Sequence, residues 1–159
     1  MQEGLLIFFC PFHPVVPSTD LKNCGDVFNS GKKSSGIFSI NPDGSGAFNV
    51  FCDQATDGGG WTVFQKRLDG SVDFYLNWAS YKTGFGSLNG EFWLGLDKIH
   101  RLTNSGSYKL RVDLEDMSGN TAYAEYNTFT VGSEETKYQL NVGSYSGEFC
   151  NDFCIVPFF

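Results

Sequence analysis

The clearest pattern in the chain is a strict alternation of apolar and charged residues over residues 108–115, YKLRVDLE. Leu110, Val112 and Leu114 fall on one side of an extended chain, and the charged residues fall on the other. The pattern predicts a half-buried strand with one solvated, charged face.

Two further strands follow this one in the pattern. Residues 121–131 and 138–144 are rich in β-branched and aromatic residues, and an acidic loop at residues 132–135 joins them. A turn at residues 116–120 connects them to the alternating strand. We therefore expect an antiparallel meander in this part of the chain.

Two helices are expected before the meander. Residues 77–82 predict a short helix that ends at Gly84, with Trp78 and Tyr81 pointing inward. A second and longer helix ends at residues 104–106. It is marked by apolar residues spaced three apart, namely Trp93, Leu96, Ile99 and Leu102.

The segment of residues 21–53 predicts a short helix followed by a hairpin. Cys24, Val27 and Phe28 share one helical face. Residues 37–40 and 47–51 are strand-like, and the turn-forming sequence NPDG at residues 41–44 joins them. This segment should form a compact N-terminal subdomain.

Three consecutive glycines, Gly58 to Gly60, run directly into the strand-like residues 61–65. Glycine reaches positive φ without steric cost, so a tight bend is predicted, and Trp61 is expected in the sheet interior beyond it. A phosphate-binding loop is not favoured, because no helix and no Lys-Ser/Thr pair follows the glycines.

These residues belong to a longer string, CDQATDGGGWTVFQKRLDGSVDFYLNWASYKTGFGSLNGEFWLGLDKIHRLT, which starts at Cys52. The string resembles the fibrinogen C-terminal domain of fibrinogen chains, ficolins, tachylectins, tenascins and angiopoietins. The resemblance runs from Leu21 to Gly147.

The resemblance and the patterns together predict an α+β fold. A disulfide-pinned N-terminal subdomain, residues 21–53, is followed by a twisted, mainly antiparallel β-sheet flanked by short helices, residues 54–147. Residues 1–20 are interpreted as a leader outside the domain, and residues 148–159 as a tail outside the family. The chain is thus expected to hold an incomplete form of the domain.

Composition and charge narrow the functional classes. A chain of 159 residues with 41% hydrophobic residues is long enough for one domain with its own core. Its net charge of −7 disfavours nucleic acid as a partner. The apolar run at residues 5–9 is too short to cross a bilayer. Residues 1–20 also make a poor signal peptide, although an unusual signal peptide is an alternative.

Five cysteines leave at least one without an intramolecular partner. The family resemblance implies a disulfide between Cys24 and Cys52, and the alternative is two buried thiols. The pairing of Cys10, Cys150 and Cys154 is left open.

The candidate metal ligands do not form a convincing site. His100 has no partner at ligand spacing, and Cys150 and Cys154 lack the second ligand pair of a structural zinc site. The carboxylates of Asp113, Glu115 and Asp116 lack the oxygen-rich spacing of a calcium loop. No cofactor is expected, and the calcium site of the family has no counterpart in the sequence.

The resemblance implies an extracellular, non-enzymatic recognition module of lectin-like type, secreted and used in innate recognition or adhesion, in an impaired or fragmentary form. Its partners would be extracellular glycans or acetylated ligands. The alternative is a matrix or receptor-ligand domain of the tenascin or angiopoietin kind, which binds a cell-surface protein. An enzyme is not favoured, since no Ser/His/Asp or Cys/His pairing has supporting context. Self-association is also expected, through apolar surface around Tyr138, Leu140 and Val142.

Overall fold

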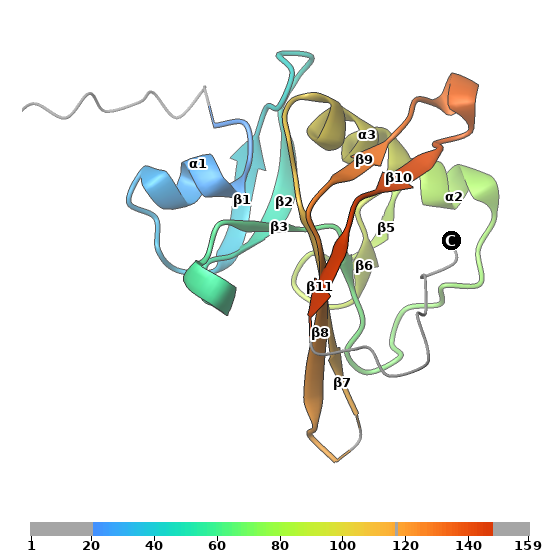
Figure 1. Cartoon of the computed structure of the whole chain (residues 1–159). Coiled ribbons are helices and arrows are strands. Elements are labelled where there is room, and N and C mark those ends of the chain that lie inside the picture. Colours follow the sequence, from blue (N-terminus) through green and yellow to red (C-terminus); the bar gives the residue numbers. More distant parts are fainter. Residues whose placement is uncertain (1–20, 117, 148–159) are drawn as a thin grey trace, which may run out of the picture.

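The computed structural model describes residues 21–116 and 118–147 (Figure 1). The predicted leader and tail, with Cys10, Cys150 and Cys154, lie outside these residues. Within them the chain forms short helices and small sheets, and every strand pairing is antiparallel. The α+β prediction is confirmed, although the strands divide among several small sheets. No helix in the described part is long and apolar enough to span a membrane.

The N-terminal subdomain is built as predicted from a helix and a hairpin. Helix α1 (Cys24–Asn29) is capped by Asn23, whose side-chain oxygen accepts a hydrogen bond from the Asp26 N–H at 3.0 Å. Strands β1 (Gly36–Ile40) and β2 (Phe48–Asp53) form the hairpin. A disulfide joins Cys24 in α1 to Cys52 in β2, and both cysteines are fully buried.

The predicted bend at the glycines is present, as the 3-10 turn η1 (Thr56–Gly58) and the two glycines after it. Positive φ angles run through Asp57, Gly58, Gly59 and Gly60. A Cβ atom on Gly59 would lie 2.6 Å from the carbonyl oxygen of Gln54, so only glycine fits there.

The expected strand after the bend is divided between two sheets. Strand β3 (Trp61–Val63) joins β1 and β2, whereas β4 (Gln65–Lys66) pairs with β6 (Phe92–Trp93) in a second sheet. The break falls at Phe64, whose carbonyl oxygen accepts a hydrogen bond from the Leu94 N–H.

The expectation that Trp61 lies in the sheet interior is wrong. Its side chain is half-buried, because β3 is the last strand of the order β1-β2-β3 and has no neighbour on its other side among the described strands. The indole therefore faces a cavity.

The first predicted helix in the middle of the chain is present. Helix α2 (Trp78–Thr83) begins at the Asn77 cap and ends at Gly84. Tyr81 is half-buried, as expected. Trp78 is 53% exposed, so its predicted inward orientation is wrong; its ring packs against Tyr138 instead.

The second predicted helix, α3 (Leu96–Asn104), is shorter than its apolar pattern suggested. Trp93 belongs to β6, which pairs with both β4 and β5 (Phe85–Gly86). The helix begins only after Gly95, where φ is 107° and a Cβ atom would lie 2.6 Å from the Thr83 carbonyl. Ile99 and Leu102 are buried, as the pattern predicted.

The predicted meander is present but broken. Strands β7 (Leu110–Glu115), β8 (Thr121–Tyr126) and β11 (Tyr145–Gly147) form a sheet in the order β11-β8-β7. Strands β9 (Phe129–Val131) and β10 (Leu140–Val142) form a separate pair, with the 3-10 turn η2 (Glu134–Thr136) between them.

The strand predicted over residues 121–131 is interrupted at Asn127 and Thr128, between β8 and β9. The strand predicted over residues 138–144 forms only over residues 140–142, and Gly143 and Ser144 lie between β10 and β11. The two interruptions hydrogen-bond to each other across the gap, from Gly143 N–H to the Thr128 carbonyl and from Asn127 N–H to the Ser144 carbonyl.

The burial of β7 differs from the alternating pattern at both faces. Leu110 is buried, but Leu114 is 49% exposed. The β7–β8 hairpin projects beyond the other described elements, so none of those elements packs against its far end (Figure 1). On the charged face, the Arg111 side chain is only 14% exposed, so this face is not uniformly solvated.

The prediction of an exposed apolar surface around Tyr138 is also wrong in part. Tyr138 is buried, and its hydroxyl donates a hydrogen bond to Asp97 on α3. Leu140 is half-buried, and Val142 is 40% exposed. Desolvation raises the pKa of Tyr138, and the hydrogen bond to Asp97 adds to this shift.

Glu91 is a buried carboxylate that organises the loop after β4. Its Oε1 atom accepts hydrogen bonds from the N–H groups of Leu68, Asp69 and Gly70, and Oε2 accepts one from Val72, at distances of 2.7 to 3.0 Å. The bonds from Leu68, Val72 and Gly70 lower the pKa of Glu91 to about 2.

We predict that Glu91→Gln destabilises the fold, because an amide nitrogen would face N–H groups that now donate to a carboxylate. The melting temperature at pH 7 should fall by about 5 °C or more. The ordinary pKa is higher than the folded value, so the stabilisation by Glu91 is present above about pH 4.5 and is lost as the pH falls toward about 2. Thermal melts between pH 2 and pH 7 measure both effects.

The matched control for this prediction is Glu135→Gln, which changes an exposed carboxylate on η2. It should leave the melting temperature and its pH dependence close to those of the parent. Equal melting curves for Glu91→Gln and Glu135→Gln would contradict the proposed role of Glu91.

We also predict that non-reducing peptide mapping of oxidised protein recovers Cys24 and Cys52 in one linked peptide. The bond closes a loop with a sequence separation of 28. The loop-entropy relation gives about 3.5 kcal/mol for such a loop, so Cys24→Ser with Cys52→Ser should lower the free energy of unfolding by about that amount. Alkylation of both thiols in native, unreduced protein would show that the bond is absent.

Candidate functional site

A cavity lies between the N-terminal subdomain and strand β7. Its volume is about 390 Å³. Trp61 and Thr62 of β3 form one wall, and Lys109, Leu110 and Arg111 form another. The cavity therefore lies between the last strand of one sheet and the last strand of another.

The deep part of this cavity is apolar. Its lining comes from α3, β7, β9 and the break after β3, and consists of Phe64, Ile99, Leu102, Leu110 and Phe129. The rings of Phe64 and Phe129 stack with their centroids 5.5 Å apart. An apolar group of a ligand could enter here without leaving a buried polar atom unpaired.

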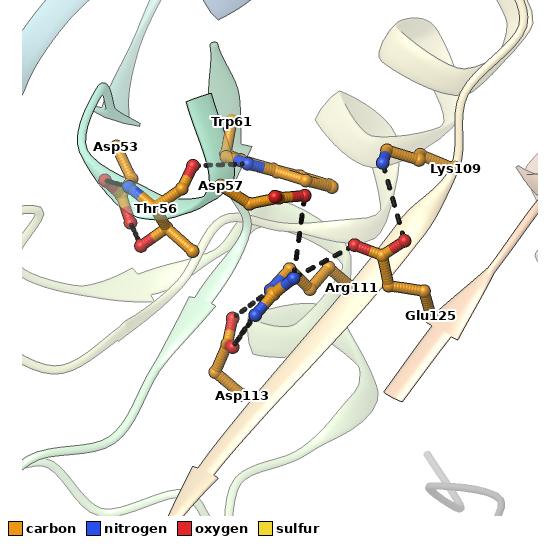
Figure 2. Close-up of polar contacts among 8 residues, drawn as sticks. All are labelled: Asp53, Thr56, Asp57, Trp61, Lys109, Arg111, Asp113 and Glu125. Carbon is orange, nitrogen blue, oxygen red and sulfur yellow. Dashed lines mark hydrogen bonds and ion pairs between the residues drawn. The ribbon is translucent and has the colours of Figure 1, made fainter. Parts of the chain in front are cut away.

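Trp61 forms the aromatic wall of the cavity, and the preceding turn fixes its position. The indole N–H donates a hydrogen bond to the Thr56 carbonyl at 2.9 Å (Figure 2). The Asp53 carboxylate holds that same turn through the backbone N–H and the hydroxyl of Thr56. Burial opposes ionisation of Asp53, but these hydrogen bonds outweigh it and lower its pKa.

A network of charged side chains forms the rim (Figure 2). Arg111 donates to both carboxylate oxygens of Asp113, at 2.9 and 3.0 Å, and to Glu125 of β8 at 3.0 Å. Its contact with Asp57 is looser, at 3.7 Å. Lys109 lies 3.5 Å from Glu125 and 4.9 Å from the centre of the Trp61 ring.

The charges in this network are largely matched within the protein. Hydrogen bonds to Asp113, and then to Glu125, raise the pKa of Arg111 above its ordinary value, although burial opposes the shift. Both cations of the rim already face carboxylates. The cavity thus offers an aromatic wall, an apolar interior and hydrogen-bonding groups, without a surplus cation for an anionic ligand.

The structure does not bring the described candidate metal ligands of the sequence together into one site. His100 lies on α3, with Nδ1 2.8 Å from the Val131 carbonyl oxygen. Asp113 pairs with Arg111, and Asp116 accepts hydrogen bonds from the backbone of Ser118 and Asn120 in the β7–β8 turn. In the described ranges no group of three or more His, Cys, Asp or Glu side chains could hold a metal ion.

The sequence patterns missed the residues of this cavity. Arg111 lies about 50 residues after Asp57 and Trp61 in the chain, and only the fold brings it beside them. The one available signal is the alternation of Lys109, Arg111 and Asp113, which by itself indicates a solvated face.

Comparison with known proteins finds relatives that share about half of their aligned residues with this chain. The chain is 50% identical over 127 residues to Ryncolin-4 of Cerberus rynchops and 52% identical over 130 residues to Fibrinogen C domain-containing protein 1 of Homo sapiens. These matches cover 80% and 78% of the chain, but only 37% and 28% of the two relatives. The chain therefore spans well under half the length of either protein.

Solved structures agree with this relationship. The fibrinogen-like globe domain of human ANGPTL2 superimposes with a TM-score of 0.79 at 46% identity, and the match covers 80% of this chain and 60% of that one. Lamprey fibrin D-dimer, complexed with the peptide Gly-His-Arg-Pro-amide, gives a TM-score of 0.78 at 40% identity, with coverage of 91% and 48%.

The family match is longer than the resemblance in the sequence. Residues 20–155 match the family described as fibrinogen beta and gamma chains, C-terminal globular domain, so the match extends beyond Gly147. Proteins of this family are non-enzymatic recognition and structural modules. The chain belongs to the fibrinogen C-terminal domain family.

Proposed function

We propose that the chain is an extracellular, non-enzymatic recognition module of lectin-like type, which serves innate recognition or adhesion. Its family and relatives support a module that binds ligands. The observation that carries the finer proposal is the cavity beside Trp61, with its aromatic wall, apolar interior and hydrogen-bonding rim. Nucleic acid is not expected as a partner, because the net charge is −7.

The chemistry of the cavity favours a neutral ligand with a small apolar group. Carboxylates already pair with Lys109 and Arg111, so an anionic ligand would have to displace one of these carboxylates. An acetylated sugar combines a methyl group for the apolar interior, hydroxyls and an amide for the rim, and a flat face for the indole. We therefore take acetylated glycans as the ligand class.

Retention on an acetylated-sugar resin tests this proposal. We expect weak retention, and Trp61→Ala should reduce the retained fraction about tenfold or more, as loss of a central tryptophan does in other binding sites. Trp78→Ala is the matched control, because Trp78 is 53% exposed on α2 and does not line the cavity. Equal retention of the two variants would exclude the cavity as the glycan site.

We also propose that the chain does not bind calcium at the site usual in its family. Calcium needs six to eight oxygen ligands, and Asp113 and Asp116, among the described acidic residues, are engaged with Arg111 and with a turn. Isothermal titration with calcium should give no stoichiometric heat, and a chelator should not change retention on the resin. Stoichiometric uptake with chelator-reversible retention would contradict this proposal.

A second candidate function is a matrix or receptor-ligand domain of the tenascin or angiopoietin kind. The likeness to the globe domain of human ANGPTL2 favours it. The two candidates differ in what they bind on a cell surface. Binding that is lost when cells are treated with glycosidases supports the lectin-like function, whereas binding lost only on protease treatment supports a protein receptor.

A further inference from the structure

Strand β7 presents an unpaired edge in the described part of the chain. It pairs with β8 along its whole length, from Leu110 opposite Tyr126 to Glu115 opposite Thr121. In the order β11-β8-β7 it is the last strand, so its other edge has no partner among the described strands. Such an edge can add a strand from another chain through main-chain hydrogen bonds.

The sequence of this strand is complementary to itself. If a second copy lies antiparallel, with Val112 opposite Val112, each residue faces the one equally distant on the other side. Leu110 then faces Leu114, Arg111 faces Asp113, and Lys109 faces Glu115. Apolar residues meet apolar residues and every charge meets its opposite, which stabilises antiparallel pairs.

We propose that two copies of this chain associate through their β7 edges in this register. The twofold axis passes between the two Val112 residues, so the contact is the same on both copies and closes on itself. The occupant of the edge is thus a second copy of the chain. This inference does not rest on the proposed glycan function, and the partner strand would compete with a glycan for the same cavity.

The burial of the two leucines fits this pairing. Leu114 is 49% exposed on the projecting end of the hairpin, whereas Leu110 is 6% exposed and lines the cavity. Residues opposite each other in an antiparallel pair project to the same face. The partner's Leu114 would therefore lie beside Leu110, at the apolar interior of the cavity, and each copy would contribute one leucine to the other.

The charged face would exchange some contacts within the chain for contacts between chains. The carboxylate of Asp113 now pairs with Arg111 of its own strand, and the partner's Asp113 would face the same guanidinium. Asp57 lies at this edge with the loosest contact, 3.7 Å from Arg111, and its side chain is 55% exposed. The pairing requires that the Asp57 side chain moves away from Arg111, so that the partner strand can lie there.

Sedimentation velocity over a range of concentrations tests the proposal through one charge pair. Lys109→Glu and Glu115→Lys each place like charges opposite one another twice in a homodimer, so each variant alone should dimerise roughly tenfold more weakly than the parent. An equimolar mixture of the two variants restores both opposite-charge pairs and should recover dimerisation. A change that only damaged folding would not be rescued by mixing.

Further variants separate this interface from general effects. Lys109→Gln and Glu115→Gln, as neutral controls, should weaken dimerisation less than the reversals do. Leu114→Asp should abolish dimerisation, whereas Leu68→Asp, at another exposed leucine, should not. Asp57→Asn should leave dimerisation intact or strengthen it. The proposal would be overturned if the protein is a monomer at every concentration. It would also be overturned if dimerisation is equally strong in the parent, in both charge-reversal variants and in their mixture.

Discussion

The arrangement of the domain depends on the close approach of the glycine turn to helix α1. At Gly59 a Cβ atom would lie 2.6 Å from the Gln54 carbonyl and 2.7 Å from the Phe28 ring, so only glycine fits at this position. The Gln54 side chain fixes the approach, because it donates to the Cys24 carbonyl and accepts from the Gly60 N–H. The wall of the cavity follows from this turn, since it determines where Trp61 leaves the subdomain.

Local signals in the sequence were sufficient wherever neighbouring residues determine the structure. The helix predicted over residues 77–82 with its end at Gly84 corresponds closely to α2, and the turn at residues 41–44 correctly joined β1 to β2. These features depend on φ preferences and on hydrogen bonds over a few residues. The family resemblance supplied the Cys24–Cys52 pairing, which the spacing of the cysteines alone left open.

The features that sequence patterns missed depend on distant parts of the chain. Alternation placed Leu114 on a buried face, but within residues 21–116 and 118–147 no element packs over the end of the hairpin that carries it. Trp61 has a strand pattern, yet its burial depends on whether a strand lies beyond β3. Arg111 lost its expected exposure because Glu125 and Asp57 surround it from other elements. A period along one strand contains no information about such neighbours.

Glu91 holds a surface loop through hydrogen bonds to the main chain of the loop and not to its side chains. The carboxylate contacts the peptide N–H groups of residues 68–70 and 72, and every residue except proline carries that group. Only Gly70, with φ at 74°, is restricted by its backbone conformation. The exposed Leu68 side chain can therefore vary between descendants of one gene while the loop keeps its course, whereas the Asp69 side chain also accepts a hydrogen bond from the Ser71 N–H. A family that diversifies its binding surfaces could use such a loop to explore new sequences at little risk to the fold.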